Sequence, residues 1–176
     1  MVEKFIIRLA EPRDIKNVFD LSNDGAVRAM SIHPEKIEWD AHVKWFDGAL
    51  KNPDLKFYVA ESADGDFIGQ IRFARDNAEW VVSISLVEKY RGKGIAKSIL
   101  QQSIKLSNLK NIAAYIYNTN HASLNVFEKS GFRDTHLLKY VFNNSGICVG
   151  GGNQPIIVCI SFPHCAKSNG GMSYAA

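Results

Sequence analysis

The stretch of sequence with the clearest chemical potential is a basic, glycine-rich loop, Arg91-Gly92-Lys93-Gly94-Ile95-Ala96. It follows an alternating apolar run and precedes residues with helical spacing, so it lies between a predicted strand and a predicted helix. A helix that begins after glycines exposes backbone N–H groups at the positive end of its dipole, and glycine lets an anion come close. Arg91, Lys93 and Lys97 add positive charge. The loop therefore predicts a phosphate or pyrophosphate site.

Two common phosphate-binding patterns do not fit this loop. A Walker A loop ends in Gly-Lys-Ser/Thr, whereas Lys97-Ser98 follows Ala96. A dinucleotide-binding fingerprint would need a glycine in place of Lys97 and would follow the first strand of the domain. The pattern Arg-Gly-x-Gly-x-Gly/Ala, late in a domain and between strand and helix, does fit. It resembles the acetyl-CoA pyrophosphate loop of the GNAT superfamily of N-acetyltransferases.

A second stretch, Asn120 to Phe132, supports the same resemblance. It is similar to the second GNAT signature, an Asn-x-Ala-Ser helix that ends in Gly-Phe. Asn120 is a typical N-cap residue, and Gly131 is a typical residue at the end of a helix. The resemblance covers about Phe5 to Phe142 and implies an enzyme that transfers an acetyl group.

The elements that must position these motifs alternate between strand and helix patterns. Helices are expected to begin near Glu11, Trp39, Ile95 and His121. The expected strands are 5–9, 57–60, 67–73, 80–86, 112–117 and 132–142, with 57–60 and 67–73 forming an antiparallel hairpin. In strand 80–86, apolar residues alternate with Ser83 and Ser85, so one face is apolar and the other is small and polar. The fold class is therefore α/β.

The family resemblance gives this arrangement a more specific form. It implies a mixed, mostly antiparallel central sheet, flanked by helices and splayed between the fourth and fifth strands, 80–86 and 112–117. Acetyl-CoA would lie in the splay, with its pantetheine paired to the backbone of the fourth strand and its pyrophosphate on the glycine loop. The residues implied to bind acetyl-CoA are Ile84, Ser85, Leu86, Arg91, Gly92, Lys93, Gly94, Ile95, Ala96, Asn120, Ser123 and Phe127.

The family mechanism asks for an oxyanion donor and for groups that move protons. A backbone N–H at Leu86 is the natural oxyanion donor. The acceptor amine must lose a proton, for which the candidate bases are Glu79, acting through water, and His42 or His33 in the segment that walls the acceptor site. Many GNAT enzymes protonate the leaving thiolate with a tyrosine, and Phe127 stands at that position. A thiol pKa of about 8.5 makes the thiolate a fair leaving group, so Phe127 is compatible with an active enzyme.

The acceptor is predicted from a narrower resemblance. His42, Trp45, Phe46 and the run Gly69-Gln70-Ile71-Arg72-Phe73 resemble bacterial GNAT proteins of nucleotide-sugar pathways. Those proteins acetylate the amine of UDP-linked amino sugars on the way to pseudaminic-acid-type surface glycans. A protein N-terminus, a polyamine and an antibiotic amine remain alternatives. So does a domain that binds acyl-CoA without turning it over, because it would need the same glycine loop.

The amino-acid composition argues against several other classes of function. The chain has 176 residues, 46% of them hydrophobic and 22% charged, which is typical of one globular domain. Its net charge of +3 is spread out without a basic, aromatic stripe, which argues against nucleic acid as a partner. No apolar run is long enough for a membrane span or a secretory segment, so we expect a cytoplasmic protein. Three cysteines without paired spacing predict no disulfide framework and no metal site.

The C-terminal part is expected to differ from the rest. Residues 1–143 are predicted to form the acetyltransferase domain. Residues 144–176 are predicted to hold a closing strand at about 155–162 and a flexible tail, because glycines and small polar residues are frequent there. The oligomeric state is left open, and a homodimer is allowed.

Overall fold

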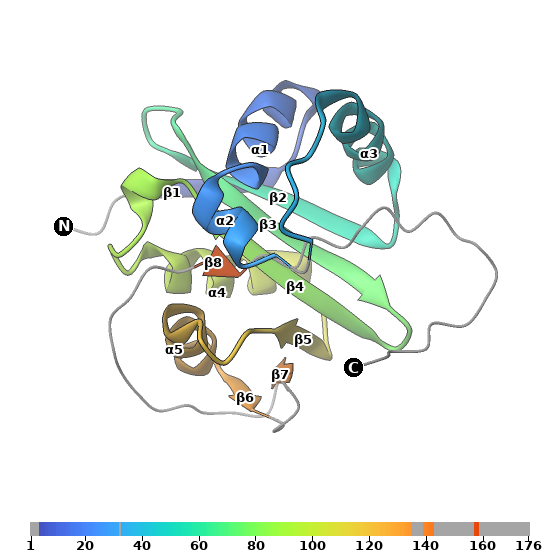
Figure 1. The fold of residues 1–176 in the computed structure, drawn as a ribbon. Helices are drawn as coiled ribbons and strands as arrows, with labels where there is room; N and C mark the ends of the chain where they lie inside the picture. The colour runs from blue at the N-terminus through green and yellow to red at the C-terminus, as the bar shows by residue number, and fades with distance from the viewer. Residues whose placement is uncertain (1–3, 32, 135–138, 143–156, 159–176) are drawn as a thin grey trace.

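The computed structural model describes residues 4–31, 33–134, 139–142 and 157–158 (Figure 1). Strands and helices alternate as expected for an α/β protein. In chain order the elements are β1 (Phe5–Leu9), η1 (Pro12–Asp14), α1 (Ile15–Ser22), α2 (Gly25–Ala29), α3 (Trp39–Lys51), β2 (Leu55–Ser62), β3 (Phe67–Asp76), β4 (Glu79–Leu86), η2 (Glu88–Tyr90), α4 (Ile95–Ser107), β5 (Ile112–Tyr115), α5 (His121–Lys129), β6 (Phe132–Asp134), β7 (Lys139–Phe142) and β8 (Ile157–Val158).

One sheet runs through the molecule in the order β1-β2-β3-β4-β5-β7-β6, and β8 pairs with β4 off this path. Every pair is antiparallel except β4 with β5, which is parallel. Figure 1 shows α1 and α3 on one face of the sheet and α4 on the other. The predicted mixed, mostly antiparallel sheet flanked by helices is confirmed.

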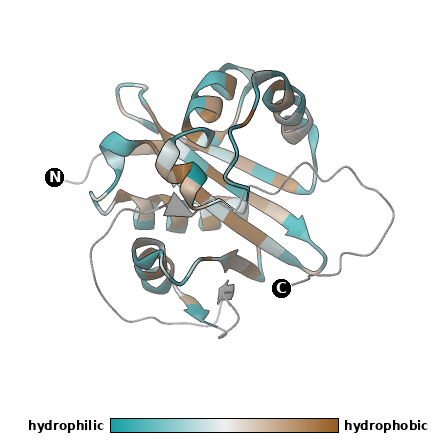
Figure 2. Ribbon diagram, in the orientation of Figure 1, coloured by the Kyte–Doolittle hydropathy of each residue, from teal (hydrophilic) through white to brown (hydrophobic). Residues whose placement is uncertain are grey.

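The two faces of β4 differ in the way that its alternating sequence predicts. Ile84 lies opposite Ile71 of β3, and both belong to the large core cluster beneath α4. Ser85 lies opposite Gln70, whose amide donates a 3.3 Å hydrogen bond to Ser22 of α1. The apolar face therefore packs on α4, and the small polar face looks toward α1. In Figure 2, β3 and β4 are largely hydrophobic, whereas α1 and α3 carry hydrophilic segments.

Two local predictions differ from the structure. The single strand expected over 132–142 is wrong, because β6 and β7 pair antiparallel with each other, Phe132 opposite Phe142, and the chain must reverse between them. The short helix α2 was not predicted. It has five residues, too few to establish a helical period, and it begins with a glycine. Asp24 caps it by accepting bonds from the N–H groups of Ala26 and Val27, both at 3.1 Å.

Gly69 marks the closest approach of β3 to β4. It lies opposite Leu86, and a Cβ built on it would be 2.2 Å from the Ser85 carbonyl oxygen and 2.7 Å from Leu86 Cδ2. Gly69→Ala is expected to lower the free energy of unfolding by about 1–3 kcal/mol, because backbone must move to relieve the clash.

Chemical denaturation would measure this loss. The matched control is Gly48→Ala in α3, where an added Cβ meets nothing within 4 Å. Removing a glycine from a helix interior is worth about 0.5–1 kcal/mol, so the control should be slightly stabilised. Equal stability of Gly69→Ala and the wild type would contradict the close approach.

Candidate active site

The centre of the sheet opens between β4 and β5. The two strands pair only at Trp80 with Ile112 and Val81 with Ala113. Beyond Val81, the described part of β5 gives β4 no further partner, although β4 continues to Leu86. The predicted splay between the fourth and fifth strands is therefore confirmed. We call this opening the central gap.

The residues predicted to meet pantetheine lie along the central gap. β3 pairs with one edge of β4 as far as Leu86, which lies opposite Gly69. A strand has backbone groups on two edges, so the second edge of β4 faces the gap from Val82 onward. The Ile84 and Leu86 N–H groups face this edge, where an extended polar ligand could pair with them, whereas the Ser85 carbonyl oxygen faces Gly69 of β3.

The glycine loop lies at the end of β4 and forms an open anion cradle. Gly92 and Gly94 have φ values of 71° and 75°, and Gly94 is the N-cap of α4. Such φ values favour glycine, and a Cβ added at either residue would meet nothing within 4 Å. In the described chain, residues 92 to 96 donate no turn or loop backbone hydrogen bond. Their N–H groups, at the positive end of α4, are available to a phosphate.

Arg91 anchors the cradle. Its Nε donates a 2.8 Å bond to the Leu86 carbonyl oxygen, and Nη2 forms a 2.9 Å ion pair with Oδ1 of Asp24. Its own N–H donates a 3.0 Å bond to the carbonyl oxygen of Glu88. This N–H is therefore used inside the protein, and the arginine ties the loop to β4 and α2. A role of the Arg91 amide in phosphate binding stays a prediction.

The second motif borders the same region from α5. Asn120 caps this helix as predicted, because its Oδ1 accepts a 3.1 Å bond from the N–H of Ser123. Ser123 is fully buried, and its Oγ has no hydrogen-bond partner in the described chain. Buried hydroxyls are normally bonded, so this group fits a polar atom of a bound ligand. Phe127 is also fully buried and packs edge-on against Phe132, with ring centroids 4.8 Å apart.

The structure does not bring the candidate bases to the central gap. His42 is 1% exposed, and its Nε2 lies 3.1 Å from the carbonyl oxygen of Ile15, so the ring joins α3 to α1. Glu79 begins β4, and five residues at about 3.3 Å each place its Cα about 16 Å along the strand from Ile84. His33 is exposed after α2. A catalytic role for any of the three stays a prediction, and for Glu79 it requires a chain of waters.

A row of polar residues beside the central gap was recognised only in part from the sequence, through Ser85 and the run 69–73. On the face toward α1 and α3 it comprises Gln70 and Arg72 of β3 with Ser83 and Ser85 of β4, paired across the ladder. Gln70 is 1% exposed, and its Oε1 has no partner in the described residues. The Arg72 guanidinium lies 5.2 Å from the centre of the Trp45 ring. Gln and Arg alternating with apolar residues in β3 were the available signal.

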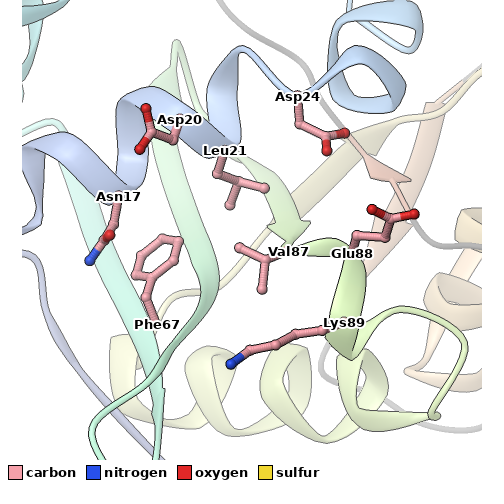
Figure 3. Close-up of a pocket in the computed structure, with 8 residues that line it drawn as sticks. All are labelled: Asn17, Asp20, Leu21, Asp24, Phe67, Val87, Glu88 and Lys89. Atoms are coloured by element: carbon pink, nitrogen blue, oxygen red, sulfur yellow. The ribbon is translucent and has the colours of Figure 1, made fainter.

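A separate acidic pocket of about 440 Å³ opens beside the end of β4 (Figure 3). Figure 3 shows the carboxylates of Asp20, Asp24 and Glu88 around the apolar side chains of Leu21 and Val87. None of its lining residues comes from β5 or α5, so it is distinct from the central gap. The described residues contain no group of three side chains placed to hold a metal ion.

Asp24 links this pocket to the cradle, because it caps α2 and holds Arg91. Asp24→Ala is expected to lower the free energy of unfolding by about 1 kcal/mol through the lost cap. It should also weaken CoA binding several-fold by freeing Arg91. The control is Asp20→Ala, which lines the same pocket but forms only an exposed pair with Lys16. Denaturation and calorimetric titration with CoA would compare them, and equal effects would contradict the anchoring role.

Comparisons with known proteins agree with this architecture. Residues 4–133 match the family described as acetyltransferase (GNAT) domain. A Bacillus subtilis (strain 168) relative, "Putative phosphinothricin acetyltransferase YwnH", is 30% identical over 150 residues, covering 80% of this chain and 91% of that protein. The crystal structure of a putative phosphinothricin N-acetyltransferase has a TM-score of 0.68 and 25% identity, covering 81% of this chain and 100% of that one.

A more distant structure shares the fold. The spermidine N-acetyltransferase of Vibrio cholerae, solved with CoA and spermine, has a TM-score of 0.68 and 19% identity. The alignment covers 74% of this chain and 81% of that one.

A sheet opened beside a helix-start anion cradle can hold an extended, phosphorylated ligand. The family match makes this assignment specific: the chain belongs to the GNAT acetyltransferase family and is an N-acetyltransferase. The fold and the enzyme class predicted from the two motifs are confirmed. The narrower resemblance to nucleotide-sugar acetyltransferases stays a prediction. Among the described residues, no helix is both long and apolar enough to cross a membrane.

Proposed function

We propose that the chain transfers the acetyl group of acetyl-CoA to a primary amine of a small molecule that also carries an anionic group. The observation that carries the donor assignment is the anion cradle at the head of the central gap. The N–H groups of residues 92 to 96, which donate no turn or loop backbone bond in the described chain, would bind the pyrophosphate of acetyl-CoA. The edge of β4 that is turned away from β3 and leads away from the cradle is suited to pair with pantetheine.

The reaction follows from this placement. The acceptor nitrogen attacks the thioester carbonyl carbon, a C–N bond forms, and the C–S bond breaks to release the CoA thiolate. Negative charge develops on the carbonyl oxygen, and a β4 backbone N–H facing the gap, assigned to Leu86, would stabilise it. The acceptor must reach the carbonyl from the polar face of β4, because the apolar face is packed under α4.

Proton transfer is the less specified part of the mechanism. The ammonium of the acceptor must lose a proton before it can attack. With His42 bonded to Ile15 and Glu79 distant along β4, we propose that water carries this proton away from the gap. Phe127 cannot protonate the leaving thiolate, which is stable enough to leave because a free thiol has a pKa of about 8.5.

The anionic character of the acceptor is proposed from the charges on the face that it must approach. Arg72 of β3 and Arg28 of α2 both lie on the side of the sheet covered by α1 and α3, and Arg28 is 7% exposed. Their guanidinium groups, of which that of Arg28 also donates a 2.8 Å bond to the His33 carbonyl oxygen, would attract a carboxylate, phosphinate or phosphate. A nucleotide-linked amino sugar and an amino acid such as phosphinothricin both meet this requirement.

A thiol-release assay with acetyl-CoA and a panel of amines tests the proposal. The panel comprises phosphinothricin, a UDP-linked 4-amino sugar, spermidine and a peptide with a free N-terminus. We expect acceptor-dependent release with at least one of the first two and the least release with spermidine. Release with spermidine alone would overturn the anionic acceptor. CoA binding without release by any amine would favour an acyl-CoA-binding module.

A further inference from the structure

The edge of β4 that faces the central gap is already paired in part with another strand of the same chain, β8. β8 pairs antiparallel with β4, Ile157 opposite Ser85 and Val158 opposite Ile84. It also contacts α2 and α5, the helices on either side of the gap. Figure 1 shows the short red β8 beside β4, away from β5, β7 and β6.

The pairing of β3 with β4 shows which edge of β4 is bonded to β8. At the same two positions, Ser85 lies opposite Gln70 and Ile84 opposite Ile71. A strand has only two edges, so β8 must lie on the one that faces the central gap. β5 has stopped pairing with β4 three residues earlier, at Val81. β8 therefore uses the backbone edge that the proposed function gives to pantetheine.

A permanent β8 and bound acetyl-CoA exclude each other at this edge. The backbone N–H and C=O of Ile84 point to the gap edge and can serve one partner there, whereas the Ser85 carbonyl oxygen faces Gly69 of β3. A GNAT acetyltransferase needs its donor site, and β8 pairs with β4 over only two residues. So short a pairing is easily exchanged for another extended partner.

We propose that the segment carrying β8 is an internal competitor of acetyl-CoA: it pairs with β4 in the empty enzyme and leaves when the donor binds. This inference rests on the proposed donor site. The apparent dissociation constant then equals the intrinsic one divided by the fraction of molecules with the edge free. If the edge is free in about one molecule in ten, the competitor weakens donor binding about tenfold.

The test uses the full chain with Ile157→Pro and Val158→Pro together. Proline has no N–H and does not extend a ladder, so the double variant should lose β8 pairing. Calorimetric titration with CoA should give a dissociation constant about threefold to tenfold lower than that of the wild type. The matched control is Ile157→Ala with Val158→Ala, which shortens the same side chains but keeps both N–H groups. Its dissociation constant for CoA should be closer to that of the wild type than to that of the proline variant.

Amide hydrogen exchange gives a readout that does not depend on CoA. Without ligand, exchange at the Ile84 N–H should be faster in the proline variant than in the wild type. Added CoA should speed exchange at residues 157–158 of the wild type while β4 remains protected. Unchanged CoA affinity in the proline variant, or residues 157–158 that stay protected with CoA bound, would overturn the competition.

The same pair of measurements separates this inference from the donor assignment. If neither protein binds CoA and the proline variant still exchanges faster at β4, β8 pairing stands and the donor site is wrong. If both bind CoA equally and exchange at β4 is unchanged, the donor site stands and β8 is not its competitor.

Discussion

Gly94→Asp is expected to weaken acetyl-CoA binding by on the order of 100-fold or more. Gly94 is the N-cap of α4, with a φ of 75° and open space where a Cβ would lie. The new carboxylate would stand in the cradle that receives the pyrophosphate. Two unit charges about 8 Å apart repel by about 2 kcal/mol at the effective dielectric constant near a protein surface, and pyrophosphate carries more than one charge.

Two control variants isolate the cause of this loss. Gly94→Asn has nearly the same size as Gly94→Asp, and asparagine tolerates a left-handed backbone, so its smaller loss measures shape without charge. Gly65→Asp introduces the same carboxylate at a φ of 86°, also in open space, in the turn between β2 and β3. It should bind CoA as the wild type does.

Calorimetric titration at two salt concentrations would make the comparison. Electrostatic repulsion is screened by salt. The difference in CoA affinity between Gly94→Asp and Gly94→Asn should therefore become smaller as ionic strength rises. If Gly94→Asp binds CoA as tightly as the wild type, the cradle is not the pyrophosphate site.

The cradle could be predicted from sequence because its determinants are local. Gly92 and Gly94 set their own backbone angles, and a helix start exposes N–H groups whatever surrounds it. The alternation of β4 was equally local, since every second residue faces the same side. The splay beside β5 was not, because it depends on where two strands separated by a helix stop pairing. It came from the family resemblance.

The other features that the sequence did not predict depend mostly on contacts between residues that are far apart in the chain. The pairing of β6 with β7 defines the reversal between them, and the residue pattern of 132–142 does not reveal it. β8 lies within the closing strand expected at about 155–162, but its partner β4, about seventy residues earlier in the chain, could not be predicted. His42 is a different case: it stands four residues before the buried Phe46 on α3, so helical geometry alone could have placed it on the core face.

A large loss of stability is also expected when Arg8 near the start of the chain is replaced. This residue of β1 joins η1 to β2. Its two terminal nitrogens each donate a 2.7 Å bond to Asp14, and one also bonds Glu61. The Asp14 side chain is 3% exposed and also accepts a 2.8 Å bond from the N–H of Glu11. This network fixes the entry to α1, the helix that bonds Gln70 through Ser22.

Arg8→Met is expected to lower the free energy of unfolding by about 3 kcal/mol, because it leaves a buried carboxylate without its partner. The control is Arg13→Met, the same substitution at a side chain that is 63% exposed and pairs with Glu11 at 2.8 Å and with Glu61 at 3.9 Å. An exposed pair contributes at most about 1 kcal/mol. Urea denaturation at neutral pH measures both, and similar losses would mean that burial does not matter here.

The pH dependence of the stability loss in Arg8→Met shows how much of that loss is electrostatic. Burial alone would raise the pKa of Asp14, but the bonds from Arg8 and the Glu11 N–H outweigh it and hold that pKa below its usual range. The Arg8 bond likewise lowers the pKa of Glu61. Groups with depressed pKa values stabilise the fold above their unfolded pKa, about 4, and lose this contribution as the pH falls through the folded value.

The difference in stability between the wild type and Arg8→Met should therefore be full at neutral pH and shrink below about pH 4. Two changes act together: the wild type loses its ion pairs as the carboxylates take up protons, and the variant no longer buries an unpaired charge. Arg13→Met should differ little from the wild type throughout the same range. A difference that stays constant down to pH 3 would show that Arg8 stabilises the protein by packing its aliphatic stem, not by its charge.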